Sequence, residues 1–431
     1  MNAKEMEVTL IKKEVVTVQL PKHEDHWLPL SNLDFCILHP LDFSIFFCYK
    51  KPTCKDNWTF VAMVEVLKKA LKEALVPFYA LAGEKVPNSM GEYKLHCNNR
   101  GVDFTDAFAN VELQKLNLYE PDEIIGCKLV PKKKNGVLAV QATGFKCGGL
   151  VLACTFDHQI VDAYSAGMFL VSWAEIAQSK PFSSLPTFNR EMLIPRHPVS
   201  FDPSLHNLYV PITMFNPSND PEPGANHFEN RICLVKADII NQLQSQASTK
   251  ESKRTKLESF SALLWKISAK SAKNKRVSKL GIVVDGRTML SFGDKEKTSL
   301  MSSYFGNVLS IPYDTKKIDE LIEKPLSWVA NEVYGFLEGA KTKEHFLDLI
   351  DWVEAHRPVQ SLAKVPTIKG GFCDGEGRQW PASSYFPAVV GMRFVVPKLN
   401  PSNSGDGVVY MHLSKGELEL IKHEASHVFS P

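Results

Sequence analysis

The chain has 431 residues, of which 44% are hydrophobic and 23% are charged. This composition is typical of globular proteins and excludes disordered, fibrous and membrane classes. Its 50 basic and 48 acidic residues give a formal net charge of +2, so no global field would draw it to nucleic acid or to an anionic bilayer. We therefore expect small-molecule partners and no nucleic acid.

The length of the chain and the spacing of its cysteines indicate the number of domains and the cellular compartment. The chain exceeds the size at which one hydrophobic core usually stops growing, which favours two domains. The nine cysteines are odd in number and contain no CxxC pair, as is usual in a reducing compartment. The N-terminal MNAKEMEVTLIKKEVV resembles a first strand rather than a signal peptide, and no run approaches the roughly 18 apolar residues of a membrane span. These features predict a cytosolic protein.

The first half of the chain indicates mixed α and β structure. Four strand-like stretches lie at 43–50, 93–98, 136–145 and 149–156, each β-branched or aromatic and bounded by turn residues. Residues 60–78 (FVAMVEVLKKALKEALVPF) predict an amphipathic helix. Its apolar face would carry five residues: Val61, Val64, Leu67, Leu71 and Leu75.

Seven prolines follow within 29 residues, a density that no regular helix or central strand tolerates. They are Pro195, Pro198, Pro203, Pro211, Pro217, Pro221 and Pro223. We interpret this stretch as a crossover between domains. The predicted division is an N-terminal domain at 1–194, a linker at 195–225 and a C-terminal domain at 226–431.

The second half repeats the alternation of strands and helices. Residues 227–247 predict a strand and then a helix opened by Asp238 as N-cap. A helix follows at 256–272, a strand and turn at 279–287, a helix at 323–340, and a last strand and helix at 408–425. The regular βαβ cadence and a GxGxxG turn are both missing, which argues against a dinucleotide-binding domain.

The stretch CTFDHQIVDAYS (154–165) places a histidine between a buried strand and an apolar helix at 163–177. A neutral histidine on such a connection can accept a proton near pH 7. Spacing alone favours a structural role for His158, and Asp162 is equally compatible with a helix cap. The chain has no GxSxG elbow and no HExxH pair, so neither a serine hydrolase nor a metal site is expected.

The pattern His158-x-x-x-Asp162 resembles the HxxxD signature of the plant BAHD acyltransferases, which use CoA thioesters. Six further blocks resemble that family in the expected order and extend the likeness over nearly the whole chain. They are LPLSNLDF (28–35), FFCYKKP (46–52), LVPFYALAGEKV (75–86), SFSALLWK (259–266), VVDGR (283–287) and SYFGNVL (303–309). Among the subgroups of that family, the chain resembles those that acylate phenylpropanoid-type alcohols, such as hydroxycinnamoyl transferases and coniferyl alcohol acyltransferases.

The resemblance implies an α/β fold with two similar mixed-sheet domains of the chloramphenicol acetyltransferase-like type. A long crossover would join them, with a channel at their interface. It also implies a monomer that uses acyl-CoA as co-substrate without a tightly bound cofactor. The acyl group would pass to the hydroxyl or amine of a phenylpropanoid-type plant metabolite.

The resemblance assigns residue roles as well. His158 would deprotonate the acceptor, and Asp162 would turn away from the substrate to pair with Arg287. Ser259 and Phe260 would lie near the pantetheine or nucleotide arm of CoA, although a core helix face explains the phenylalanine equally well. The block Tyr304–Asn307 would pack near the channel.

The family's second signature, DFGWG, is missing from the chain. The nearest candidate is a shortened form within FCDGEGRQWPASSYFP, made of Asp374, Gly375, Glu376 and Gly377. In the family the tryptophan of this motif has been assigned to oxyanion stabilisation, and loss of such a donor costs roughly 3–4 kcal/mol in the transition state. Trp380 is a conceivable substitute. Three hypotheses follow: an acyltransferase with an altered oxyanion arrangement, an enzyme with a different reaction or donor on the same scaffold, and a non-catalytic binding or regulatory protein.

Overall fold

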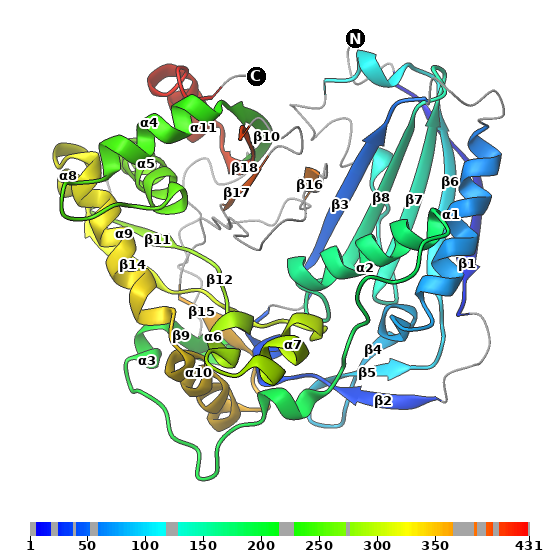
Figure 1. Cartoon of the computed structure of the whole chain (residues 1–431), viewed down its shortest axis with the longest axis horizontal. Coiled ribbons are helices and arrows are strands. Elements are labelled where there is room, and N and C mark those ends of the chain that lie inside the picture. Colours follow the sequence, from blue (N-terminus) through cyan, green and yellow to red (C-terminus); the bar gives the residue numbers. More distant parts are fainter. Residues whose placement is uncertain are drawn as a thin grey trace.

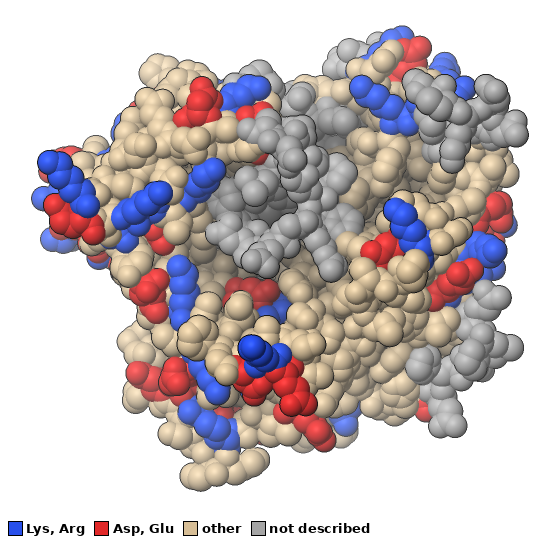
Figure 2. Space-filling view, in the orientation of Figure 1, with Lys and Arg blue, Asp and Glu red and all other residues tan. Residues whose placement is uncertain are grey.

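The computed structural model describes residues 6–18, 25–37, 40–51, 59–117, 128–214, 228–272, 276–364, 383–385, 394–399 and 405–429. It is an α/β fold whose strands form one six-stranded sheet and several smaller ones (Figure 1). Within these residues, no helix combines the length and hydropathy needed to cross a membrane. Acidic and basic side chains are interspersed over the face shown in Figure 2, which fits the small formal net charge.

The six-stranded sheet is mixed, because β6 and β7 run parallel while the other neighbours are antiparallel. Its central strands β7 and β8 are buried along their whole length, which explains why they appear in the sequence as continuous apolar runs. The predicted strands at 43–50, 136–145 and 149–156 are confirmed. In spatial order the strands are β1 (Val8–Val16), β6 (Val102–Ala109), β7 (Leu138–Phe145), β8 (Leu150–Asp157), β3 (Asp42–Tyr49) and β16 (Ser383–Tyr385).

Helices α1 (Phe60–Ala74) and α2 (Ala163–Ala177) lie beside this sheet and contact each other (Figure 1). The predicted helix at 60–78 is confirmed in α1, but Val61 was wrongly placed on its buried face and is 69% exposed. In the first turn, the ring of Phe60 points inward and packs against Gly144. A Cβ added at Gly144 would lie only 2.7 Å from this ring. Val61 is rotated about 100° from Phe60 around the helix axis.

A three-stranded antiparallel sheet lies at one end of the large sheet (Figure 1). Its order is β2 (His26–Pro29), β5 (Tyr93–Cys97) and β4 (Glu84–Pro87). Strand β5 confirms the prediction at 93–98. The single-turn 3-10 helix Asn32–Cys36 follows β2 and is stabilised by a capping box between Ser31 and Asp34.

A second group of elements is built around another three-stranded sheet, with strand order β10 (Phe228–Val235), β18 (Gly407–Ser414) and β17 (Phe394–Leu399). Its helices are α4 (Ala237–Ala247), α5 (Lys256–Ser271), α8 (Ile318–Glu323), α9 (Leu326–Ala340) and α11 (Lys415–Glu424) (Figure 1). The predicted helices at 256–272 and 323–340 are thus confirmed, the second one beginning after Pro325.

The prediction that Asp238 caps α4 is wrong. The helix begins at Ala237 with Lys236 as N-cap, and Asp238 lies in the first turn. The amide nitrogen of Ala237 donates to Asp406 Oδ1 at 2.9 Å, so the capping oxygen comes from a residue that is distant in the sequence.

Shorter elements connect the two groups. The strand pairs are β11 (Val277–Gly281) with β14 (Tyr313–Lys317), β12 (Val284–Asp285) with β13 (Leu309–Ser310), and β9 (Tyr209–Pro211) with β15 (Ser361–Ala363). The helices are α3 (Leu205–Leu208), α6 (Arg287–Ser291), α7 (Lys295–Ser303) and α10 (Lys343–His356). The described part of the proline-rich stretch, 195–214, runs along α10, where Arg196 forms ion pairs with Asp348 and Asp351.

Candidate active site

His158 lies on the connection between β8 and α2, as the sequence indicates. Its backbone nitrogen donates to the carbonyl of Leu41 at 2.9 Å. The imidazole lies against the ring of Phe43, with 4.8 Å between ring centroids. The residue is 7% exposed, so protein atoms cover most of the ring and only a small part of the residue faces solvent.

Asp162 is both a helix cap and half of an ion pair. Its Oδ1 accepts a hydrogen bond from the backbone nitrogen of Ser165 at 2.8 Å, which caps α2. Its Oδ2 lies 2.8 Å from Arg287 Nη1, and Oδ1 lies 3.2 Å from Nη2. The two residues are 0% and 5% exposed. Burial opposes the charge of Arg287, but the carboxylates of Asp162 and Asp285 outweigh it and raise the pKa of the guanidinium above its usual value.

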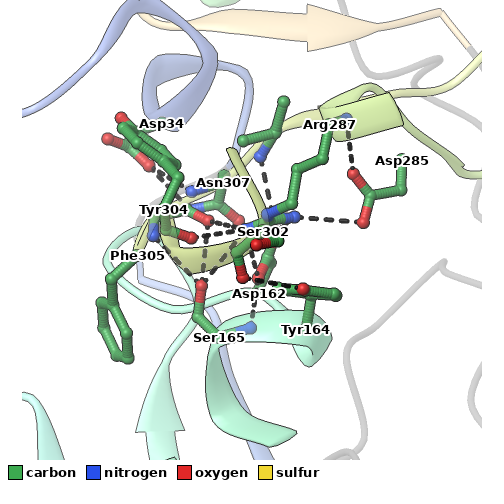
Figure 3. A network of polar contacts seen from close by, with 12 residues as sticks. Asp34, Asp162, Tyr164, Ser165, Asp285, Arg287, Ser302, Tyr304, Phe305 and Asn307 are labelled. Atoms are coloured by element: carbon green, nitrogen blue, oxygen red, sulfur yellow. Dashed lines mark hydrogen bonds and ion pairs between the residues drawn. The ribbon is translucent and has the colours of Figure 1, made fainter. Parts of the chain in front are cut away.

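Arg287 links several segments around this pair (Figure 3). Its guanidinium stacks over the ring of Tyr164 at 4.3 Å from the centroid. Its remaining hydrogen bonds go to Asp285 Oδ2 (3.1 Å), Ser165 Oγ (3.3 Å) and the carbonyls of Tyr304 (3.3 Å) and Gly306 (2.8 Å). The guanidinium therefore holds the start of α2 against the segment 304–306.

Asn307 fixes the backbone of the histidine loop from the other side. Its Nδ2 lies within hydrogen-bond distance of the carbonyl oxygens of His158 and Gln159, both at 3.0 Å. Both its Nδ2 and its backbone nitrogen lie 2.9 Å from Asp34 Oδ1. Asn307 and Asp34 are fully buried, so the orientation of the loop depends on a residue 149 positions later in the chain.

The sequence interpretation missed this role for Asn307 and expected its block only to pack. Nevertheless, Figure 3 shows that Asp34, Arg287 and Asn307 meet in one network. Each belongs to a different sequence block that resembles the family: LPLSNLDF, VVDGR and SYFGNVL. The order of those blocks was the available signal, although the sequence does not show that they converge on one loop.

The other candidate residues have different surroundings. Ser259 and Phe260 lie on α5 and are 1% and 3% exposed. The hydroxyl of Ser259 donates to the carbonyl of Thr255 at 2.7 Å, and the ring of Phe260 packs on Phe429 with centroids 5.8 Å apart. The remaining candidates, Asp374, Gly375, Glu376, Gly377 and Trp380, lie outside the described residues. Within the described residues, no three His, Cys, Asp or Glu side chains are grouped so that they could hold a metal ion.

Comparison with known proteins identifies the class. A model of the Transferase family matches residues 6–428. Omega-hydroxypalmitate O-feruloyl transferase from Arabidopsis thaliana is 30% identical over 354 residues, which cover 79% of this chain and 74% of that protein. The chain therefore belongs to this transferase family, the BAHD acyltransferases, and the family resemblance read from the sequence is confirmed.

Further relatives agree with this assignment. Shikimate O-hydroxycinnamoyltransferase from Nicotiana tabacum is 25% identical and aligns with 91% of this chain and 93% of its own length. Among solved structures, vinorine synthase superposes with a TM-score of 0.68 at 20% identity, covering 98% of this chain and 99% of its own. TRI101 from F. sporotrichioides, in complex with coenzyme A and T-2, has a TM-score of 0.73 at 13% identity and coverages of 94% and 99%. The predicted chloramphenicol acetyltransferase-like α/β fold is thus confirmed.

Proposed function

We propose that this protein transfers an acyl group from a CoA thioester to a hydroxyl group of a phenylpropanoid-type acceptor, with His158 as the general base. The observation that most directly supports this proposal is the position of His158. It lies at the end of a buried strand, and its backbone is fixed by hydrogen bonds to Leu41 and Asn307. The relatives support a CoA thioester of a phenylpropanoid-type acid as donor, since they include feruloyl and hydroxycinnamoyl transferases, whereas the acceptor class comes from the family resemblance of the sequence blocks. Acyl-CoA would be a co-substrate rather than a resident cofactor.

In the proposed reaction, the imidazole of His158 accepts the proton of the acceptor hydroxyl as its oxygen attacks the thioester carbonyl. A tetrahedral intermediate forms and then collapses, which breaks the C–S bond and expels the CoA thiolate. The thiolate takes the proton from the imidazolium, so the base returns to its neutral form. Direct transfer of this kind needs no covalent acyl-enzyme, and general-base catalysis contributes about 10²- to 10⁴-fold.

Asp162 has an orienting role in this proposal. Its two carboxylate oxygens are engaged by Arg287 and by the backbone nitrogen of Ser165, so the pair fixes the end of the loop that carries His158. Burial raises the pKa of the thiols of Cys36 and Cys97 to about 12. These thiols stay protonated near neutral pH and are poor nucleophiles, which is consistent with direct attack by the acceptor.

The test is release of free thiol from acyl-CoA in the presence of an acceptor. Feruloyl-, caffeoyl-, coumaroyl-, benzoyl- and acetyl-CoA should be combined with phenolic alcohols, long-chain alcohols and amines. We expect acceptor-dependent release with at least one pair and a loss of about 10²- to 10⁴-fold in kcat for His158→Ala. His423→Ala, on the exposed side of α11, is the matched control. No release across the panel would refute acyl transfer, whereas full activity of His158→Ala would refute the assigned base.

The proposal includes a monomer with domains at 1–194 and 226–431. Gel filtration would test the oligomeric state. Limited proteolysis should cut first between 195 and 225, and a preferred cut elsewhere would move the boundary.

A further inference from the structure

Four charged side chains gather beside His158, and we call them the Lys85 cluster: Asp42, Lys85, Lys133 and Asp157. Lys85 Nζ lies 3.0 Å from Asp157 Oδ1 and 2.9 Å from Oδ2. Lys133 Nζ lies 3.1 Å from Asp42 Oδ1 and 3.7 Å from Asp157 Oδ2. The side chains of Lys85 and Asp157 are only 5% and 7% exposed, so their charges need charged neighbours within the cluster for compensation.

Asp157 immediately precedes His158 and shapes the turn that carries it. Its Oδ1 accepts a hydrogen bond from the backbone nitrogen of Gln159 at 3.0 Å. Its carbonyl oxygen accepts from the backbone nitrogens of Ile160 at 3.1 Å and Val161 at 3.0 Å. The side-chain and carbonyl oxygens of Asp157 thus accept hydrogen bonds from the three residues after His158, which stabilises the turn that contains the histidine.

The position of Asp157 in the sheet requires compensating positive charge. Asp157 and Asp42 are direct cross-strand partners of β8 and β3, and like charges in that position destabilise a sheet. Burial raises the pKa of Asp42, which reflects the cost of a negative charge there. Lys133 and Lys85 supply this charge, and Lys85 does so from β4, a strand of the separate three-stranded sheet, so its ion pair links the two sheets.

We propose that Lys85 is a positioning residue for His158, because through Asp157 it holds the turn that sets the direction of the imidazole. This inference rests on the proposed role of His158 as general base. Lys85 takes no part in the bonds that form or break. Its loss therefore moves the base relative to the acceptor hydroxyl and leaves the substrate-binding surfaces in place.

The first test compares Lys85→Met and Asp157→Asn with the double variant. A misplacement of about 1 Å costs on the order of 10²-fold, so we expect each single variant to lose about 10- to 100-fold in kcat with KM nearly unchanged. The asparagine retains an acceptor for Gln159, and the double variant leaves no uncompensated charge between Lys85 and Asp157. Because the proposed role of Lys85 runs through Asp157, we expect the double variant to lose no more kcat than Asp157→Asn alone, rather than the product of the two single losses.

Lys68→Met is the matched control. Lys68 is equally buried, with 6% of its side chain exposed, and pairs with Asp106 at 2.7 Å in a cluster between α1 and β6. This variant should lower stability, measured by urea unfolding, and leave kcat unchanged. Equal kcat losses in Lys68→Met and Lys85→Met would attribute the effect to general destabilisation and overturn the positioning role.

A pH profile provides a readout that a purely structural role would not move. The groups around Lys85 include the carboxylates of Asp157 and Asp42, the ammonium of Lys133 and the ring of Tyr93, whose centroid lies 5.0 Å from Nζ. Burial lowers the pKa of Lys85, so its charge is lost at a lower pH than for an exposed lysine. Wild-type kcat should decline on the alkaline side, and Lys85→Arg should move that decline to higher pH because a guanidinium stays charged.

The outcomes separate this inference from the proposed function. If His158→Ala keeps full activity, the proposed base is wrong. If His158→Ala is inactive while folded Lys85→Met and Asp157→Asn both keep wild-type kcat, the positioning role is wrong and the proposed function stands. Should Lys85→Met fail to fold, the double variant and Lys85→Arg decide, because a double variant with kcat well below that of Asp157→Asn, or an unmoved alkaline limb, overturns the inference.

Discussion

The ion pair between Asp162 and Arg287 gives a sharp prediction for Asp162→Asn. The asparagine keeps an oxygen that can accept the hydrogen bond from Ser165 N, now at 2.8 Å, and so preserves the cap of α2. It removes the charge that faces Arg287 Nη1 at 2.8 Å. The substitution therefore isolates the ion pair from the helix cap, although the wild-type carboxylate has both roles.

The expected loss follows from burial and from what Arg287 retains. Removing one partner of a buried pair costs about 3–5 kcal/mol, because the other charge is left uncompensated. Arg287 keeps Asp285 Oδ2 at 3.1 Å and the carbonyl of Gly306 at 2.8 Å, so we expect the lower end, about 3 kcal/mol. A domain has about 5–15 kcal/mol of stability, hence the variant should fold but unfold at clearly lower urea concentration.

Urea unfolding and steady-state kinetics on the same preparations measure this effect. We expect kcat to fall with KM nearly unchanged, because the pair orients the loop without contacting substrate. Asp294→Asn is the control, since Asp294 caps the exposed start of α7 by accepting from Lys297 N at 2.9 Å. Its cost should stay below about 1 kcal/mol. An Asp162→Asn protein that loses no more stability than this control and keeps full kcat would refute the reasoning.

Three further predictions follow from other contacts. Asn307→Ala removes the donor to the buried carbonyl of His158, so it should lower the free energy of unfolding by about 1–3 kcal/mol and also reduce kcat; unchanged kcat would contradict its role in the loop. Burial lowers the pKa of His345 to about 4, below its unfolded value of about 6.5, so the unfolded state binds the proton first and stability is lost as pH falls through this window. His345→Gln should flatten that part of the stability profile measured by urea unfolding, and an identical profile would exclude His345 as the cause. Tyr209→Phe removes the acceptor of the Ile311 backbone nitrogen at 2.8 Å and should cost about 1–3 kcal/mol, whereas a loss within experimental error would mean that water replaces the hydroxyl.

The sequence predicted features that depend on neighbouring residues. The strand before His158 and the helix after it were correct because buried strands appear as continuous apolar runs and because Asp162 is a good N-cap. The alternatives of cap and ion pair for Asp162 were not exclusive, since one carboxylate has both functions.

Features that depend on distant residues were not predictable from local patterns. Asp406 caps α4 from 169 positions away, and Lys85 reaches Asp157 across 72 positions. Val61 has the same apolar character as Val64, yet Val61 is exposed and Val64 is buried, while Phe60 packs against Gly144. The family resemblance supplied Arg287 as the partner of Asp162, which spacing and periodicity did not indicate.

The contacts that fix the histidine loop also determine how much of the chain must be synthesised before this loop can be held in place. Strand β8 and helix α2 are complete once residue 177 has been synthesised, but Arg287 and Asn307 follow Asp162 and His158 by 125 and 149 positions. A ribosome-bound or truncated product without these residues would carry the histidine on a loop with neither guanidinium nor amide to hold it. On the proposed role of His158, an oriented general base would then require a chain that extends at least to Asn307.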